Sequence, residues 1–339
     1  MDLAARIEAI LELGRRLREP DEYRSAILSR TSFHNPWFTL DNQERAIASV
    51  AQHFLAEAPL RAWLAAYPLP EPAQPRQVGL VMAGNIPMVG FHDFLCVFLS
   101  GHHALIKLSD KDPYLFPYLL QQLTAINPEA KTRFQLQERL SGMDAVIATG
   151  SNNTARYFEA YFGKYPHIIR KNRNGVAVLT GRESDDQLKA LGKDVFRYFG
   201  LGCRNVSKLY VPEGYVFDPL LEALYEYREI VLHSKYKNNF DYHYASYLLN
   251  RLPFLANGCV LLSENAAIPS PVACLHYAYY RNIPELEQEL AARAAEIQVV
   301  VTAQPPTLSF PSVPFGQAQE PGLADYADGV DTLAFLMNI

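Results

Sequence analysis

The sequence has few cysteines, no long apolar run and no strong excess of charge. Its four cysteines are scattered over 339 residues, without a CxxC pair or zinc-type spacing, so we expect free thiols in a reducing compartment. The apolar run 94–99 is too short to span a bilayer, and the N-terminus lacks a signal-peptide core. A net charge of −5 gives no basic surface for nucleic acid. We therefore expect a cytoplasmic protein without a membrane span and without a nucleic-acid partner.

A metal motif is also missing. His102 and His103 are adjacent, so their side chains diverge on a strand, and no set of carboxylates or cysteines accompanies them. We predict no metal site.

The sequence does contain a pattern in which predicted strands alternate with predicted helices. Residues 1–75 read as largely helical, with a helix that begins at Asp41 in a capping-box pattern with Glu44, followed by a proline-rich linker at 68–75. Beyond the linker, short apolar strands alternate with helices, which is typical of a parallel α/β sheet. We expect strands at 77–82, 104–108, 143–148, 176–179, 208–211, 260–263, 274–279 and 298–301.

The length and this pattern favour two domains. We place the first at 1–182, with the N-terminal helices and the first four strands, and the second at 183–303. The segment 304–339 is expected to return to the first domain or to form an oligomer contact. The polar and aromatic stretch 236–244 reads as a loop near a site.

Cys203 differs from the other cysteines because Gly200, Gly202 and Arg204 surround it, between a helix and a strand. Glycines let backbone N–H groups approach a substrate oxygen, and a nearby cation raises the thiolate fraction of a thiol. The alternative is a buried cysteine that acts as a small apolar side chain, which is our interpretation of Cys96, Cys259 and Cys274. The local sequence leaves both open for Cys203.

Three other segments follow strands closely. Asn85 lies in a Gly-Asn-Ile-Pro turn and could donate to an oxyanion, although asparagine is common in turns. Lys107, at a strand end before Ser109 and Asp110, could hold a nucleotide, or could be an ordinary surface lysine. The segment 149–152 opens a helix with a single glycine, so it is either a phosphate site or a plain N-cap.

Together these elements resemble the aldehyde dehydrogenase superfamily, and more closely its LuxC-type acyl-CoA reductase branch, related to the fatty-acid reductase subunit of bacterial luminescence systems. The shared order is Asn-x-Pro, a strand-end lysine, Thr-Gly-Ser opening a helix, and Gly-x-x-Cys before a strand. The matching segments are Asn85-Ile86-Pro87, Lys107-Leu108-Ser109-Asp110, Thr149-Gly150-Ser151 and Gly200-Leu201-Gly202-Cys203. Residues 315–319 and 326–332 also look like the ending of small LuxC-type proteins.

The resemblance implies two Rossmann-like α/β domains, NAD(P)-binding and catalytic, with the active site in the cleft between them. It implies NAD(P)H-dependent reduction of an acyl-CoA or acyl-carrier-protein thioester to an aldehyde, through a thioacyl-cysteine. Cys203 would be the nucleophile and Asn85 the oxyanion donor. The cofactor would contact Lys107, Ser109, Asp110, Gly150 and Ser151. A partner acyl-transfer or acyl-activating enzyme and a homo-oligomer are compatible with this family.

Two departures from the superfamily pattern carry information. The general-base glutamate of hydrolytic members is missing from the matching stretch 170–175, which agrees with acyl transfer to or from a thiol. The glutamate that contacts the nicotinamide ribose has only one candidate, Glu264. Asp110 would favour a free 2′-hydroxyl, whereas the luminescence relatives use NADPH, so the cofactor is expected to be NADPH or NADH.

Two other functions fit the same residues. One is an acyltransferase or thioesterase that uses Cys203 without reduction, and the other is a non-catalytic scaffold that binds a partner enzyme.

Overall fold

The structure, a computed structural model, describes residues 1–72, 74–303, 308 and 310–339. The chain forms two compact units, one of Met1–Asn172 with Pro321–Ile339 and the other of Arg173–Glu320. The first unit ends before the predicted boundary at residue 182, because the strand that follows Arg173 pairs within the second sheet. Residues 304–307 and 309, at the start of the predicted C-terminal segment, lie outside the described residues.

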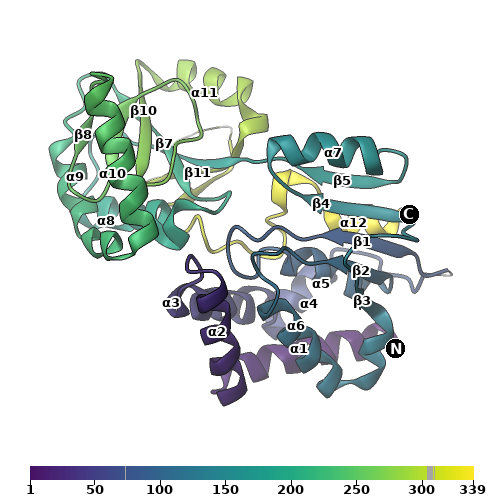
Figure 1. The fold of residues 1–339 in the computed structure, drawn as a ribbon. Coiled ribbons are helices and arrows are strands. Elements are labelled where there is room, and N and C mark those ends of the chain that lie inside the picture. The colour runs from purple at the N-terminus through teal and green to yellow at the C-terminus, as the bar shows by residue number, and fades with distance from the viewer. Residues whose placement is uncertain (73, 304–307, 309) are drawn as a thin grey trace. The chain divides into compact units, whose positions relative to one another are not determined.

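The first unit is built on a five-stranded parallel sheet in the order β3-β2-β1-β4-β5. Helix α5 packs on β1 and β2, α1 packs on α5 and α6, and α7 packs on β4 and β5 (Figure 1). The elements are α1 (Leu3–Arg18), α2 (Glu22–His34), α3 (Leu40–Ser49), α4 (Glu57–Leu64), β1 (Gln77–Val81), α5 (Phe91–Ser100), β2 (His103–Lys107), α6 (Leu115–Ile126), β3 (Phe134–Leu136), β4 (Ala145–Thr149), α7 (Asn152–Phe162), β5 (His167–Arg170) and α12 (Thr332–Met337).

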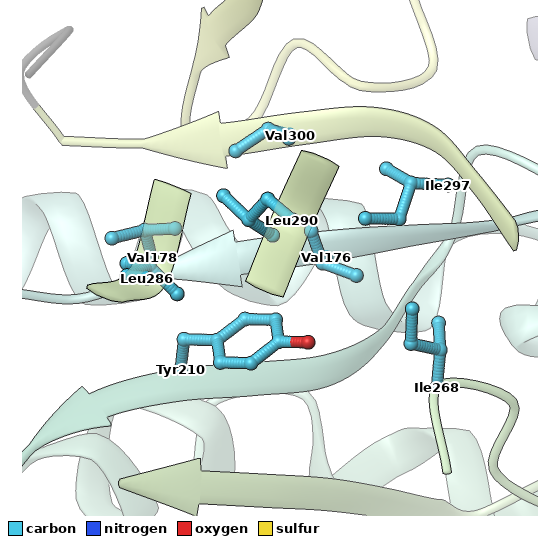
Figure 2. Close-up of a cluster of buried hydrophobic side chains, with 8 residues drawn as sticks. All are labelled: Val176, Val178, Tyr210, Ile268, Leu286, Leu290, Ile297 and Val300. Atoms are coloured by element: carbon cyan, nitrogen blue, oxygen red, sulfur yellow. The ribbon is translucent and has the colours of Figure 1, made fainter. Parts of the chain in front are cut away.

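The second unit holds a seven-stranded sheet in the order β12-β11-β6-β7-β10-β9-β8, parallel except for the β8–β9 pair. One face is closed by α11, whose Leu286 and Leu290 pack over β6, β7 and β11 with Tyr210 (Figure 2). The elements are β6 (Asn174–Val178), α8 (Asp185–Phe196), β7 (Val206–Pro212), α9 (Asp218–Tyr225), α10 (Ser234–Leu249), β8 (Leu255–Ala256), β9 (Leu261–Glu264), β10 (Cys274–Tyr280), α11 (Ile283–Ala292), β11 (Ile297–Thr302) and β12 (Ser312–Pro314).

The predicted α/β class with parallel sheets is confirmed, and three local predictions are wrong. The strand at 176–179 is β6 of the second sheet, and β5 takes its place in the first. The stretch 236–244 is not a loop but the middle of α10, where a Lys237–Asp241 ion pair one turn apart supports the helix. The N-cap before α3 is Thr39, which accepts from Asn42 N–H, whereas Asp41 pairs with Arg45.

The C-terminal residues of the first unit are fastened to its N-terminal helices. Tyr326 accepts a hydrogen bond from the indole N–H of Trp63 (2.9 Å), and its hydroxyl lies 2.7 Å from that of Tyr67. The Tyr67 hydroxyl donates a hydrogen bond to Asp331 (2.7 Å), and the buried Arg170 guanidinium donates one to the Thr332 hydroxyl (2.8 Å). These contacts complete the first unit with residues that follow the second unit in the chain.

Candidate active site

The first group of predicted site residues lies at the carboxyl ends of three neighbouring strands. In the register of the sheet, Val81 of β1 pairs with Lys107 of β2 and with Ala148 of β4. Asn85, Lys107 and the Gly150-Ser151 pair therefore follow adjacent strands at one edge. The strand order reverses between β1 and β4, which is where parallel α/β sheets bind their ligands.

The loops after β1 and β2 are in direct contact. A Cβ on Gly84 would lie 2.3 Å from Ser109 Oγ, so only glycine lets the Asn85 turn approach Ser109 this closely. Asp112 accepts hydrogen bonds from Leu115 N–H (3.3 Å) and Met88 N–H, and its burial raises the pKa of this carboxyl to about 6. The Asn85 turn and the Ser109 loop thus share one buried carboxylate.

Helix α2 supports the same loop from outside the sheet. His34 Nε2 lies 2.8 Å from the carbonyl oxygen of Asp110, and Asn35 donates to the carbonyl oxygen of Lys111 (3.2 Å). The Asp110 residue is exposed and Lys107 is half-buried, so both are accessible to a ligand. This arrangement leaves a cation and an acid available beside the carboxyl end of β2.

Gly150 and Ser151 open α7 at the point where the strand order reverses. Ser151 Oγ accepts from Thr154 N–H (3.2 Å) as the N-cap, and Gly150 lies so close to Phe158 and Thr154 that a Cβ would approach within 2.9 Å. The predicted N-cap and the predicted phosphate site therefore coincide. A helix N-terminus with a close glycine fits the pyrophosphate of a dinucleotide.

Cys203 lies in the second unit, in the turn before β7. All four cysteines are described residues, and Cys203 is the one that is partly exposed. Burial raises the pKa of Cys274 to about 11 and that of Cys259 to about 12, and burial also holds the pKa of Cys96 well above its usual value. Those three thiols stay protonated, whereas Cys203 is accessible to a substrate.

A glycine makes room for the Cys203 turn. Gly175 of β6 donates to the carbonyl oxygen of Asn205 (2.8 Å), and a Cβ there would lie 2.6 Å from Arg204 O and 2.9 Å from Asn205 O. Gly175 ends the stretch 170–175, which carries arginine, lysine and asparagine side chains and no acid. Gly175, the last residue of this stretch, lies against the backbone of the turn.

Glu264 is not part of the Cys203 turn. It is exposed at the end of β9 and pairs with Tyr277 of β10, which in turn pairs with Leu209 of β7. Glu264 is therefore two strands away from β7. It lies level with Leu209, inside β7, whereas Cys203 lies before the first residue of that strand. Its contact with a nicotinamide ribose stays a prediction.

The chain matches a known protein family over more than half of its length. Residues 42–224, more than half of the chain, match the family model described as acyl-CoA reductase (LuxC). The chain belongs to this family.

This LuxC-family chain is similar in sequence to one curated protein and similar in fold to several solved structures. The long-chain acyl-protein thioester reductase 2 of Photobacterium leiognathi is 22% identical over 190 residues, which cover 50% of this chain and only 39% of that protein. Aldehyde dehydrogenase 21 of Physcomitrella patens, solved with succinate, superposes with a TM-score of 0.72 at 12% identity, covering 100% of this chain and 84% of that one. An oxidoreductase from Marinobacter aquaeolei gives a TM-score of 0.69 at 12% identity, over 95% and 79%.

A further structural relative carries a nucleotide. An indole-3-acetaldehyde dehydrogenase in complex with NAD+ has a TM-score of 0.68 at 13% identity, over 91% of this chain and 73% of that one.

In the LuxC-family chain, no described helix is long and apolar enough to cross a membrane. Its described residues also hold no cluster of three or more His, Cys, Asp or Glu side chains suited to a metal ion.

Several residues around Cys203 were not predicted from the sequence. The buried Asn205 side chain bonds the backbone on both sides of the turn, and Gly175 lies against the turn. The buried Asp194 carboxylate accepts from the N–H groups of Gly316 and Ala318. An asparagine two residues after a cysteine has no sequence signature. The sequence offered one signal for these residues, the glycine at position 175, which ends the stretch 170–175 that lacks a general-base glutamate.

Proposed function

We propose that this chain is an NAD(P)H-dependent acyl-thioester reductase that forms an aldehyde. The observation that carries the proposal is the partly exposed Cys203, in a glycine-lined turn before β7 of a LuxC-family chain whose three other thiols are buried. The substrate would be an acyl-CoA or an acyl-carrier protein, and the name of the Photobacterium leiognathi relative supports a long-chain acyl-protein thioester.

The chemistry assigned to this chain's residues begins with acyl transfer. The Cys203 thiolate attacks the thioester carbonyl, and Asn85 with the Cys203 N–H stabilises the oxyanion, each donor being worth about 10²- to 10³-fold in rate. The substrate thiol leaves with a proton, and the acyl group stays on Cys203 as a thioester. The stretch 170–175 contains no carboxylate to activate water, which agrees with acyl transfer to or from a thiol.

The edge of the first sheet fits a dinucleotide. We assign Gly150 and Ser151 to the pyrophosphate, Lys107, Ser109 and Asp110 to the adenosine ribose, and Glu264 to the nicotinamide ribose. When bound, NADPH or NADH would supply the hydride that reduces the acyl thioester. Cys203 would then leave as a thiolate when the carbon–sulfur bond breaks, releasing the aldehyde.

The proposal is tested by mixing the protein with NADPH or NADH and a series of acyl-CoA and acyl-carrier-protein thioesters, and by following absorbance at the nicotinamide band. We expect cofactor oxidation that requires a thioester and is lost in Cys203→Ala, whereas Cys259→Ala retains it. Stable acylation of Cys203 without cofactor oxidation would instead support acyl transfer without reduction. Absence of both, or activity that survives Cys203→Ala, would refute the proposal.

A further inference from the structure

The turn that carries Cys203 is closed by a single residue, Asn205, through its backbone and its side chain. The backbone N–H of Asn205 donates to the carbonyl oxygen of Gly202 (3.1 Å), which makes Gly202–Asn205 a β-turn with Cys203 and Arg204 at its centre. The Oδ1 atom of Asn205 accepts from the Gly202 N–H (2.8 Å). Asn205 therefore holds both backbone groups of Gly202, and Cys203 lies inside the closed ring.

The other end of the same carboxamide holds the end of α8. Asn205 Nδ2 donates to the carbonyl oxygens of Asp194 (2.9 Å) and Arg197 (2.9 Å). Asn205 is 1% exposed, and its oxygen and both of its N–H groups have partners. A buried carboxamide that is used completely fixes the geometry of the segments it joins.

The segment between these two anchors is strained. Tyr198, Phe199 and Gly200 follow Arg197 with φ values of 53°, 58° and 75°, all in the left-handed region. Bulky residues adopt this conformation only where their surroundings impose it, and such residues gather at functional sites. Phe199 packs on His233, with ring centroids 4.4 Å apart, and the bonds from Asn205 hold the backbone on both sides.

We propose that Asn205 is the positioning residue of Cys203. By joining Gly202 to the last turn of α8, it fixes the backbone from which the thiol projects, and with it the direction of the Cys203 N–H. Gly202 N–H is engaged by Asn205, so it is not available as a second oxyanion donor. The role in acyl transfer rests on the proposed function, whereas the effect on the thiol does not.

The chain offers a matched control in Asn257. Its Oδ1 accepts from the N–H groups of Cys259 (3.1 Å) and Val260 (3.1 Å), and its Nδ2 donates to Leu221 O (2.8 Å). Asn257→Ala thus removes a comparable set of side-chain to backbone bonds from the same unit, in a turn that does not carry Cys203. Loss of stability alone should be similar in the two variants.

The experiment measures the rate of Cys203 alkylation by iodoacetamide over the pH range in which thiols titrate, with free cysteine as reference. We expect the pH–rate profile of the wild-type thiol to differ from that of free cysteine. The Asn205→Ala profile should approach that of free cysteine, and its alkylation rate near neutral pH should differ from the wild-type rate by about tenfold or more. Asn257→Ala should follow the wild type. If Asn205→Ala does not fold, Asn205→Ser, which retains one hydroxyl acceptor, should still depart from the wild type in the same direction.

Three results would overturn the inference: an Asn205→Ala profile that coincides with the wild type, an equal change in Asn257→Ala, or a wild-type thiol that behaves like free cysteine. Alkylation needs neither acyl thioester nor nucleotide, so these results are independent of the reductase proposal. Where cofactor oxidation is also observed, Asn205→Ala should lower kcat about 100-fold through misplacement of the nucleophile.

Discussion

Arg204 donates a hydrogen bond from Nε to the carbonyl oxygen of Ala318 (2.5 Å), so the residue after Cys203 is tied to a segment far along the chain. The same segment is held from its other side, because Gly316 N–H (2.6 Å) and Ala318 N–H (2.9 Å) both donate to the Asp194 carboxylate. The Arg204 guanidinium is a cation next to the thiol in the sequence, and it also has this structural role within the second unit.

The buried Asp194 carboxyl makes stability depend on pH. Burial raises its pKa from 3.8 to about 6, against the opposing effect of the Gly316 and Ala318 hydrogen bonds. The folded protein therefore binds this proton more tightly than the unfolded chain, and the cost of the buried charge is present above pH 6 and relieved as pH falls from about 6 to about 4. Relative to Asp194→Asn, the wild type should gain up to about 3 kcal/mol in this interval.

Urea unfolding of both proteins at several pH values checks this shift. The exposed Asp186→Asn on the same helix is the control, and its stability difference from the wild type should stay nearly constant. A difference between wild type and Asp194→Asn that does not change with pH would show that Asp194 titrates normally.

The four thiols should differ sharply in reactivity. Thiols with a pKa of about 11 to 12, such as those of Cys274 and Cys259, hold only about 10⁻³ to 10⁻⁴ of thiolate at pH 8. Native protein should therefore take up one alkyl group, at Cys203, and Cys203→Ala should take up none until urea is added. Intact mass and peptide mapping read the result, and rapid native labelling of Cys96 would contradict the buried position of that thiol.

Gly175→Ala should disturb the Cys203 turn from the neighbouring strand. The new Cβ would lie 2.6 Å from Arg204 O, so β6 and the turn must separate, at a cost of about 1–3 kcal/mol. Thermal unfolding and Cys203 alkylation should both change. Gly322→Ala is the control, since its nearest neighbour would be Asp325 Oδ2 at 3.5 Å, and it should behave like the wild type.

Asp110→Asn should move cofactor preference toward NADPH. In the proposed site, the exposed Asp110 carboxylate would repel the 2′-phosphate of NADPH, and removing its charge should improve NADPH binding relative to NADH by about tenfold. Nucleotide fluorescence titrations measure the ratio. Glu138→Gln, an exposed acid just beyond β3, controls for the general change of charge, and an unchanged ratio in Asp110→Asn would place the ribose elsewhere.

The sequence predicted best where the signal was local. Strands β1, β2 and β4 are apolar runs bounded by turn residues, and the polar groups at their ends could be placed without knowing the sheet. Strand β6 was assigned to the wrong sheet because strand pairing depends on contacts far apart in the chain. Strands β3 and β5 were missed because three or four residues carry too little pattern.

Helix α10 shows a different limit. Tyr242, Leu248 and Leu249 are exposed while Tyr236 is buried, so the helix presents apolar side chains on more than one side and has no clear amphipathic period. Around Cys203 the limit was chemical. Asn205 and Asp194 act through backbone groups, and a bond to a carbonyl oxygen or an N–H leaves no partner residue type to find in the sequence.

The chain path has a consequence for synthesis. The second unit lies between two segments of the first, so all of its residues are synthesised before Pro321–Ile339. Domains fold as units while the chain emerges, and the first unit lacks Tyr326, Asp331 and Thr332 until its second segment is made. The first unit begins the chain but is therefore completed only after the whole second unit has been synthesised, and Arg170 has no Thr332 partner until then.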